Sequence, residues 1–321
     1  MMSDVSGQPV DEASSPGEGE SPAAERTLGS ALLLGALIGL WIGSILAASI
    51  PIRLYLPNGG LGYDAHAYWL AVRAENPYGA EPGQPDAYLY SPFFLQIISP
   101  IARLSWPAFL TIWMGIEIAC LLWLTRPLPL KWRIPVLLLC MPEILFGNIY
   151  GLLGVMIVLG FRRPGLWAFA FLTKITIGLV AVVWFAARGE WRSLAWVVGC
   201  TAVLAGISAL AQPDLWVQWV EFLFNSSDSG SQISRVIRLS LALGIVYWGA
   251  RRDQRWVVPI GVLLAVPHFE FKNKDFAVLT AVPRLVGRPR SRGQEASHEG
   301  AQETAQETAQ EPAQETTEGG A

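Results

Sequence analysis

The sequence predicts an all-α polytopic integral membrane protein, a helical bundle in which some helices are short or half-crossing. Of the 321 residues, 52% are hydrophobic and only 15% are charged, which is unusual for a soluble domain of this length. The apolar residues also come in blocks. The first block, residues 28–50, contains no charged residue. As a helix it is long enough to cross roughly 30 Å of hydrocarbon.

This first block is expected to remain in the protein as a spanning helix. It is too long for a signal-peptide core, and no small-residue cleavage site clearly follows it. Residues 1–27 are rich in Ser, Gly, Pro and Glu, and residues 288–321 are of low complexity. Neither segment has enough apolar surface to fold, so both are predicted to be disordered tails. The membrane domain is therefore predicted over residues 28–287.

Beyond a long loop, residues 51–91, the chain contains eight further apolar runs, and several are shorter than a full span. In order they cover residues 93–104, 108–124, 134–161, 166–187, 194–211, 236–250, 256–266 and 276–286. The run 134–161 is long but is interrupted by Pro142, Glu143, Gly147, Asn148 and Gly151. Irregular backbone at membrane depth is tolerated only where protein buries it or where it lines a polar cavity. The middle of the protein is therefore predicted to surround a cavity.

Basic residues in short loops predict the orientation of the helices. They form clusters at Arg126/Lys131/Arg133, Arg162/Arg163, Arg188/Arg192, Arg251/Arg252/Arg255 and Arg284 to Arg292. If all these clusters are cytoplasmic, residues 134–161 return to the same side as a hairpin. Residues 166–187 are then either a half-crossing hairpin broken near Lys174 or a single span with one cluster outside. We expect the amino terminus inside and the first loop outside.

Three charged residues and one amide interrupt the apolar runs: Glu117, Glu143, Lys174 and Asn148. A charge at bilayer depth costs roughly 2.5 to 3.5 kcal/mol on insertion scales, so such residues tend to have a function. Two of them also have structural readings. Lys174 could snorkel to the membrane surface, and Glu117 could face a polar neighbour inside the bundle.

Two loops carry the remaining candidate residues. The first loop contains Asp64 in the segment Tyr63-Asp64-Ala65-His66, with many further aromatic residues. Such aromatics serve either as interfacial anchors or as surfaces for sugars and lipid head groups. The second loop runs from His268 to Asp275 and contains Lys272 and Lys274. It is either a solvated loop or a phosphate-binding cluster.

Other classes of site have little support in the sequence. Cys120, Cys140 and Cys200 each lie in an apolar run without metal-ligand spacing, so neither a disulfide nor a metal site is expected. No His and Asp set has convincing ligand spacing, and no cofactor is expected. The chain has no basic surface that would suggest a nucleic acid partner.

Several motifs together resemble the polytopic glycosyltransferases of family 87, in the GT-C class. In the first loop they are Tyr63-Asp64 through Tyr68, then Asn76-Pro77-Tyr78 and Tyr90-Ser91-Pro92. Further along are Gly147-Asn148, where the family has Gly-Gln, then Leu172-Thr173-Lys174 and the basic loop from Arg188 to Arg192. The resemblance covers roughly residues 30 to 211 and weakens beyond them. It lies in the order and spacing of the motifs.

The resemblance implies an inverting transfer of a sugar from a polyprenyl phosphate. The sugar would be a hexose of the mannose type or a pentose, and the acceptor a glycolipid or cell-envelope glycan. Asp64 matches the family's general base, and cations would hold the departing phosphate. We expect eight residues to bind substrate: Tyr68, His66, Tyr90, Asn148, Lys174, His268, Lys272 and Lys274. The site would lie in the plasma membrane on its extracytoplasmic side.

Two other readings remain open at the level of sequence. A transporter or flippase of a lipid-linked or amphipathic substrate would also explain broken helices and intramembrane charges. It does not explain a long aromatic loop with Asp64 so early in the chain. The chain could also be an inactive member of the family, because its carboxyl-terminal region is short.

Overall fold

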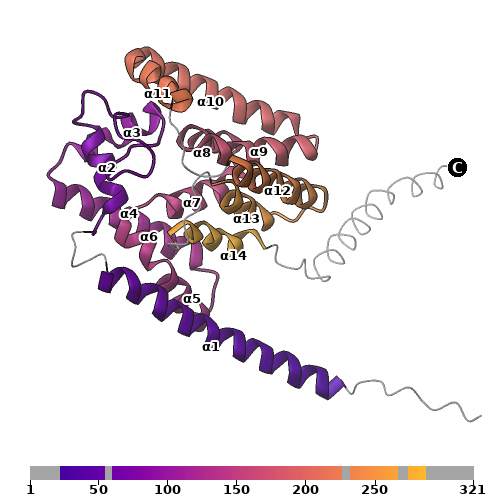
Figure 1. Ribbon diagram of the computed structural model, residues 1–321. Helices are drawn as coiled ribbons and strands as arrows, with labels where there is room; N and C mark the ends of the chain where they lie inside the picture. The colour runs from indigo at the N-terminus through magenta and orange to yellow at the C-terminus, as the bar shows by residue number, and fades with distance from the viewer. Residues whose placement is uncertain (1–21, 55–59, 226–231, 267–273, 287–321) are drawn as a thin grey trace, which may run out of the picture.

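The computed structural model describes residues 22–54, 60–225, 232–266 and 274–286, and this part of the chain is helical and contains no strand (Figure 1). Nearly all of the two predicted tails lies outside the described residues. The elements are α1 (Pro22–Leu54), α2 (Tyr63–Ala71), α3 (Pro92–Ala102), α4 (Trp106–Thr125), α5 (Leu130–Leu139), α6 (Met141–Phe146), α7 (Tyr150–Gly160), η2 (Pro164–Leu166), α8 (Trp167–Thr173), α9 (Ile175–Ala187), α10 (Trp191–Ala211), α11 (Pro213–Asn225), α12 (Gln232–Arg251), α13 (Val257–Ala265), η3 (Lys274–Ala281) and α14 (Val282–Leu285).

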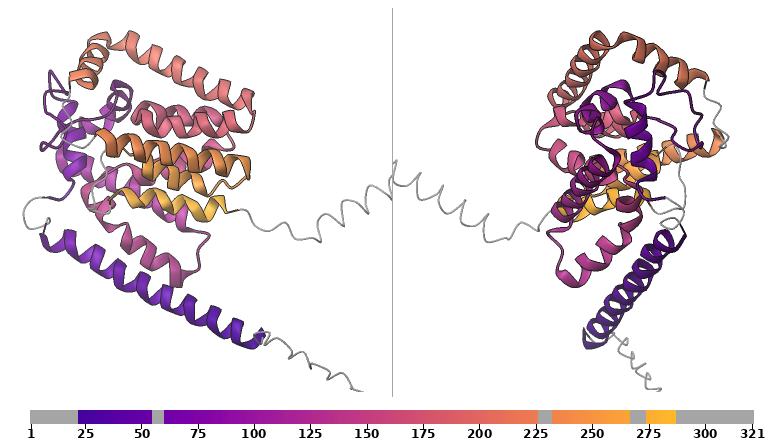
Figure 2. Two further views of the ribbon diagram at one scale, coloured as in Figure 1. Left: turned by 45° about the vertical axis from the view of Figure 1, so that its right-hand side comes forward. Right: turned by 90° about the vertical axis from the view of Figure 1, so that its left-hand side faces the viewer.

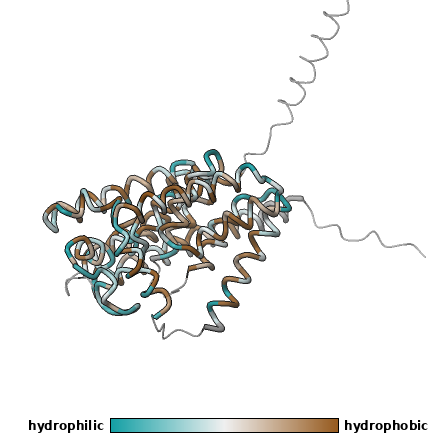
Figure 3. The backbone as a smooth tube through the Cα atoms, turned by 90° about the horizontal axis from the view of Figure 1, so that it is seen from above, coloured by the Kyte–Doolittle hydropathy of each residue, from teal (hydrophilic) through white to brown (hydrophobic). Residues whose placement is uncertain are grey.

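Three helices are long and apolar enough to cross a membrane: α1 over residues 29–53, α4 and α10. The other described helices are shorter or carry more charge. Along the bundle the apolar residues gather in the helices and the polar ones in the connections (Figure 3). The prediction of an all-α membrane protein with some short helices is therefore confirmed.

Helix α1 lies along one edge of the bundle and packs mainly on α5 and α6 (Figure 2). Many of its large apolar side chains point away from the protein, and Leu32 and Leu33 are more than 60% exposed. In water such a surface would be unfavourable, whereas in a bilayer it contacts lipid tails. This helix has the length and the exposed apolar surface of a spanning segment at the edge of the bundle.

The run 134–161 does not form one helix. The run forms most of α5 and then α6. Its backbone turns at Gly147, whose φ of 67° lies in the left-handed region that glycine favours. Trp113 Nε1 donates to Gly147 O at 2.7 Å, which fixes the turn against α4. Asn148 stands at this turn and is buried. The predicted interruption is therefore a turn inside the protein.

The run 166–187 is also a hairpin rather than one span. Lys174 separates α8 from α9 with an extended backbone, φ −141° and ψ 107°. A Cβ built on Gly178 would lie 2.7 Å from Cα of Phe171. In one continuous helix, seven residues would separate these positions by about 10 Å. The half-crossing hairpin is the alternative that the structure supports, and Lys174 lies at its tip.

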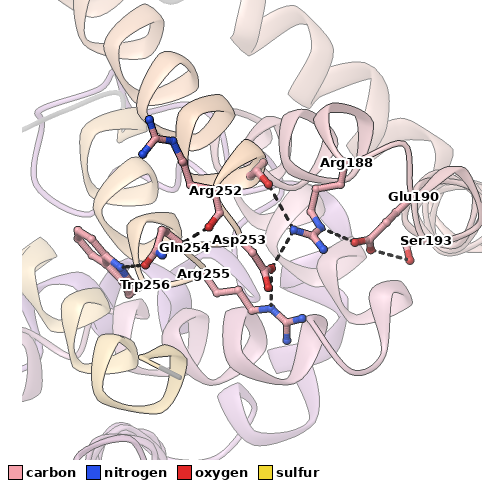
Figure 4. A network of polar contacts seen from close by, with 9 residues as sticks. Arg188, Glu190, Ser193, Arg252, Asp253, Gln254, Arg255 and Trp256 are labelled. Atoms are coloured by element: carbon pink, nitrogen blue, oxygen red, sulfur yellow. Dashed lines mark hydrogen bonds and ion pairs between the residues drawn. The ribbon is translucent and has the colours of Figure 1, made fainter. Parts of the chain in front are cut away.

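The described residues of the predicted basic clusters lie at the end of the bundle opposite these two turns, near the ends of α4, α9 and α12. Arg188 lies between Glu190 Oε1, at 2.5 Å, and Asp253 Oδ1, at 2.8 Å, so it joins the α9–α10 loop to the α12–α13 loop (Figure 4). Arg284 donates to Trp123 O, which brings the end of the described chain to the end of α4. The Arg255 guanidinium lies 5.4 Å from the Phe161 ring centre. Because both hairpins begin and end here, these clusters can share one side of the membrane without a cluster left on the other side.

Candidate functional site

A cavity of about 480 Å³ opens where the two hairpin turns meet the first loop. Its wall includes residues from α2, the loop before α3, the α6–α7 turn, the α8–α9 turn, α11, α12 and η3. Five of the residues predicted from sequence line it together: Asp64, Tyr68, Tyr90, Asn148 and Lys174. These residues come from four separate parts of the chain, so the fold assembles them at one place.

Asp64 reaches the cavity because the start of α2 is anchored on the α6–α7 turn. Gly62 N donates to Leu145 O at 2.7 Å, and Gly62 itself has a φ of 74°. A Cβ on Gly147 would lie 2.6 Å from Cβ of Ala65, so the two segments are in close contact. Asp64 is in the first turn of α2 and is half-buried. Its carboxylate is therefore held at the rim of the cavity by backbone contacts.

A row of buried polar groups extends inward from α2. The hydroxyl groups of Tyr68 and Tyr90 lie 3.0 Å apart, and Tyr90 donates to Asn148 Oδ1 at 3.5 Å. The same Asn148 oxygen accepts from Ile149 N at 2.9 Å. Burial raises the pKa of Tyr68 and of Tyr90 well above the ordinary value, so both phenols stay protonated near neutral pH. The row can donate or accept hydrogen bonds without carrying charge.

Lys174 supplies a positive charge to the cavity. Its ammonium donates to Tyr150 OH at 2.7 Å, and it lies 4.5 Å from the Tyr150 ring centre and 5.2 Å from that of Tyr90. The backbone of Tyr150 is fixed in turn, because its N–H donates to Glu143 Oε1 at 2.5 Å and Gly151 N donates to the same oxygen at 3.3 Å. Glu143 thus caps α7 from inside the protein. The cation is held by a phenol whose position depends on a buried carboxylate.

The cavity also contains residues that the sequence analysis did not select. Arg235 of α12 adds a second cation, and Asp275 of η3 adds a second carboxylate. Trp219 and Phe222 of α11 supply aromatic surface. Tyr150 was likewise overlooked, since an aromatic residue inside an apolar run gives no signal of its own. A weak signal was available for Arg235, which stands at the start of an apolar segment.

Four predicted substrate-binding residues are not seen in the wall of the cavity. His66 Nδ1 lies 2.7 Å from Asp86 Oδ1, and its ring stacks on Trp69 and meets Trp106 edge-on. His268 and Lys272 lie outside the described residues. Lys274 begins η3, but its side chain is outside the described part of the structure.

The remaining intramembrane charge, Glu117, is fully buried between α4 and α7. Its carboxylate lies against Gly151, so that a larger residue at position 151 would require the carboxylate to move, and it is not part of the cavity wall. Within the described ranges, no group of three or more His, Cys, Asp or Glu residues is arranged to hold a metal ion.

Comparison with known proteins gives one match. The model of glycosyltransferase family 87 matches residues 88–284 of the chain. This region includes Tyr90, Asn148, Lys174 and Arg235 and continues to residue 284, well past residue 211, where the resemblance was expected to weaken. It starts after Asp64 and Tyr68. Neither a curated protein nor a solved structure was found to match the chain.

Proposed function

The chain belongs to glycosyltransferase family 87, and we propose that it transfers a sugar from a polyprenyl phosphate to a hydroxyl group of a glycolipid or cell-envelope glycan. The proposed sugar is a hexose of the mannose type or a pentose. The observation that carries the proposal is the shared cavity. Asp64 and Lys174, a carboxylate and a cation from segments 110 residues apart, line one space, and α7 and α8, which supply part of its wall, pack on the candidate spans α4 and α10.

The proposed reaction is a single displacement with inversion. The acceptor oxygen attacks the anomeric carbon, and its proton passes to the Asp64 carboxylate. The bond between the anomeric carbon and the phosphate oxygen breaks, and polyprenyl phosphate leaves with that electron pair. A half-buried carboxylate at the rim of the cavity is suited to accept a proton from an incoming hydroxyl group.

Lys174 and Arg235 are proposed to bind the phosphate. Negative charge on the leaving oxygen grows in the transition state, so cations already in position stabilise that state more than the ground state. Lys174 is suited to this role because its contact with Tyr150 orients the ammonium beforehand. The neutral row of Tyr68, Tyr90 and Asn148 would bind sugar hydroxyl groups by hydrogen bonds.

The reaction is proposed to occur on the extracytoplasmic side of the plasma membrane. The cavity lies at the opposite end of the bundle from Arg188, Arg255 and Arg284. Basic loops favour the cytoplasmic side. This orientation gives the cavity access to lipid-linked sugars in the outer leaflet.

The test uses membranes that contain the full chain, incubated with polyprenyl-phosphate sugars labelled in the sugar. Covalent label in a glycolipid fraction, absent with the Asp64→Asn variant, is the expected result. Label that crosses to another compartment while still attached to polyprenyl phosphate would contradict transferase activity. The same assay with labelled mannose, glucose and pentose donors identifies the sugar.

A further inference from the structure

A second cavity, of about 260 Å³, lies between the first loop and α11. One wall is the segment 76–81, and the other is the carboxyl-terminal half of α11. The two cavities share one residue, Phe222, whose ring centre lies 5.6 Å from that of Tyr78. Phe222 therefore belongs to the wall of this space and to the wall of the cavity that contains Asp64.

The lining of the second cavity is rich in groups that bind hydroxyl groups. It contains three side-chain amides and two carboxylates: Asn76, Gln218, Asn225, Glu81 and Glu221. Amides donate and accept, and a carboxylate accepts several hydrogen bonds. The aromatic side chains Tyr78 and Phe222 complete the lining with apolar surface on which the C–H face of a sugar ring can pack. A polyhydroxylated ligand matches both kinds of group.

Two of these amides, those of Asn76 and Gln218, have a hydrogen-bonding group that such a ligand can use. Asn76 Oδ1 accepts from Tyr78 N at 3.0 Å, which fixes the amide and leaves its NH₂ group as a donor. Gln218 Oε1 is shielded from solvent, and the described part of the chain offers it no hydrogen-bond partner. A shielded acceptor without a donor costs free energy, and a ligand hydroxyl group would satisfy it once the Gln218 side chain turns into the cavity that it lines.

The charged residues that line the two cavities favour different kinds of ligand. The second cavity has Glu81 and Glu221 in its lining, and no Lys, Arg or His among the described residues that form it. A phosphate would be repelled there, whereas Lys174 and Arg235 attract it in the first cavity. The donor phosphate and a neutral saccharide would therefore be sorted to different sides of Phe222.

We propose that the second cavity binds a saccharide unit of the acceptor, next to the unit whose hydroxyl group enters the first cavity. This inference rests on the proposed glycosyl transfer. It assigns acceptor recognition to the segment 76–81 and α11. The chemical class recognised is an uncharged oligosaccharide, so an acceptor with at least two sugar units is used better than one with a single unit.

The test measures acceptor dependence in Gln218→Leu, which keeps the size of the side chain and removes its polar atoms. The full chain is assayed with labelled polyprenyl-phosphate sugar and increasing amounts of a glycolipid extract from the host membranes. The half-saturating amount of extract should rise about tenfold, while the KM for the donor changes by less than twofold. Asn76→Ala, on the exposed loop, should act in the same direction if Gln218→Leu accumulates poorly.

Val217→Ala is the matched control, because Val217 precedes Gln218 on α11, is 57% exposed and lines neither cavity. Unchanged half-saturation in both Gln218→Leu and Asn76→Ala, with transfer intact, would overturn the acceptor site and leave the proposed function standing. A wild-type chain that transfers no label to any glycolipid would refute the proposed function itself, and the acceptor site with it.

Discussion

The ammonium group of Lys174 lies 2.7 Å from the hydroxyl oxygen of Tyr150, and the two residues come from the tips of different hairpins. Each hairpin begins and ends at the basic end of the bundle and places its turn beside the same cavity. A cation inside an apolar segment is costly unless a partner stabilises it. The phenol supplies such a partner and also directs the charge toward the cavity.

Lys174→Met should lower turnover with a polyprenyl-phosphate sugar by roughly 10²-fold, because it removes a preorganised cation from the proposed phosphate site. Methionine keeps most of the apolar stem, so the amount of folded protein should change little. Tyr150→Phe keeps the charge and removes only its hydrogen-bond acceptor, so its effect should be smaller, below about tenfold. Steady-state kinetics on purified variants measures both. Normal kinetics in Lys174→Met would make this residue a snorkelling side chain and move the phosphate site elsewhere.

Asp64→Asn should lower turnover by roughly 10² to 10⁴-fold with normal expression, because the amide has the same shape but cannot accept the proton. Asp86→Asn is the matched control in the same loop. Asp86 contacts His66 and is not part of the wall of the first cavity, so its variant should retain most activity. Near-normal turnover in Asp64→Asn combined with a large loss in Asp86→Asn would reverse the assignment of the base.

Gly147→Ala should destabilise the protein by at least about 1 kcal/mol, because the residue has positive φ and its Cβ would lie 2.6 Å from Cβ of Ala65. The thermal inactivation temperature in detergent should fall. Gly115→Ala is the control, since a Cβ there meets no atom within 4 Å and alanine is the better helix former. Equal inactivation temperatures for the two variants would show that the contact between α2 and the α6–α7 turn is not tight.

The orientation of the bundle predicts which loops an impermeant thiol reagent can reach in intact cells. Starting from a chain without its own cysteines, a Cys at Gln84 in the exposed first loop should be labelled. A Cys at Arg192, in the exposed basic end, should react only after permeabilisation. The opposite pattern would put the cavity on the cytoplasmic side and change the compartment of the reaction.

The two hairpin turns could be located from the sequence, because each contains residues that do not suit an apolar run. Lys174 in an apolar run and the Pro and Gly residues between 142 and 151 marked the two hairpin turns, because charge and irregular backbone are unfavourable in lipid. They could not show that both turns meet at one cavity. That depends on how α4, α7 and α8 pack, which no local pattern encodes.

Which side chains of the first loop face the cavity could not be predicted from the sequence, as Asp64 and His66 show. Asp64 and Tyr68 are four apart, so they share a face of α2, and both line the cavity. His66 lies two residues from Asp64 and therefore points elsewhere, toward Asp86 and Trp106. Before the helix was known, closeness in sequence made His66 look like a neighbour of the site. Arg235 was overlooked for the opposite reason, because an Arg at the start of an apolar helix resembles an ordinary interfacial anchor.

The α8–α9 hairpin also constrains how the protein can be made. With seven residues, α8 is only about 10 Å long, so its extended turn at Lys174 cannot rest in lipid and must be covered by protein. The arm that follows this turn, α9, packs on α12 and α13, which are synthesised after it. During translation the hairpin must therefore wait in the insertion machinery or near the membrane surface until the later helices arrive. Nascent chains that stop after residue 211 should be recognised by membrane quality control and degraded.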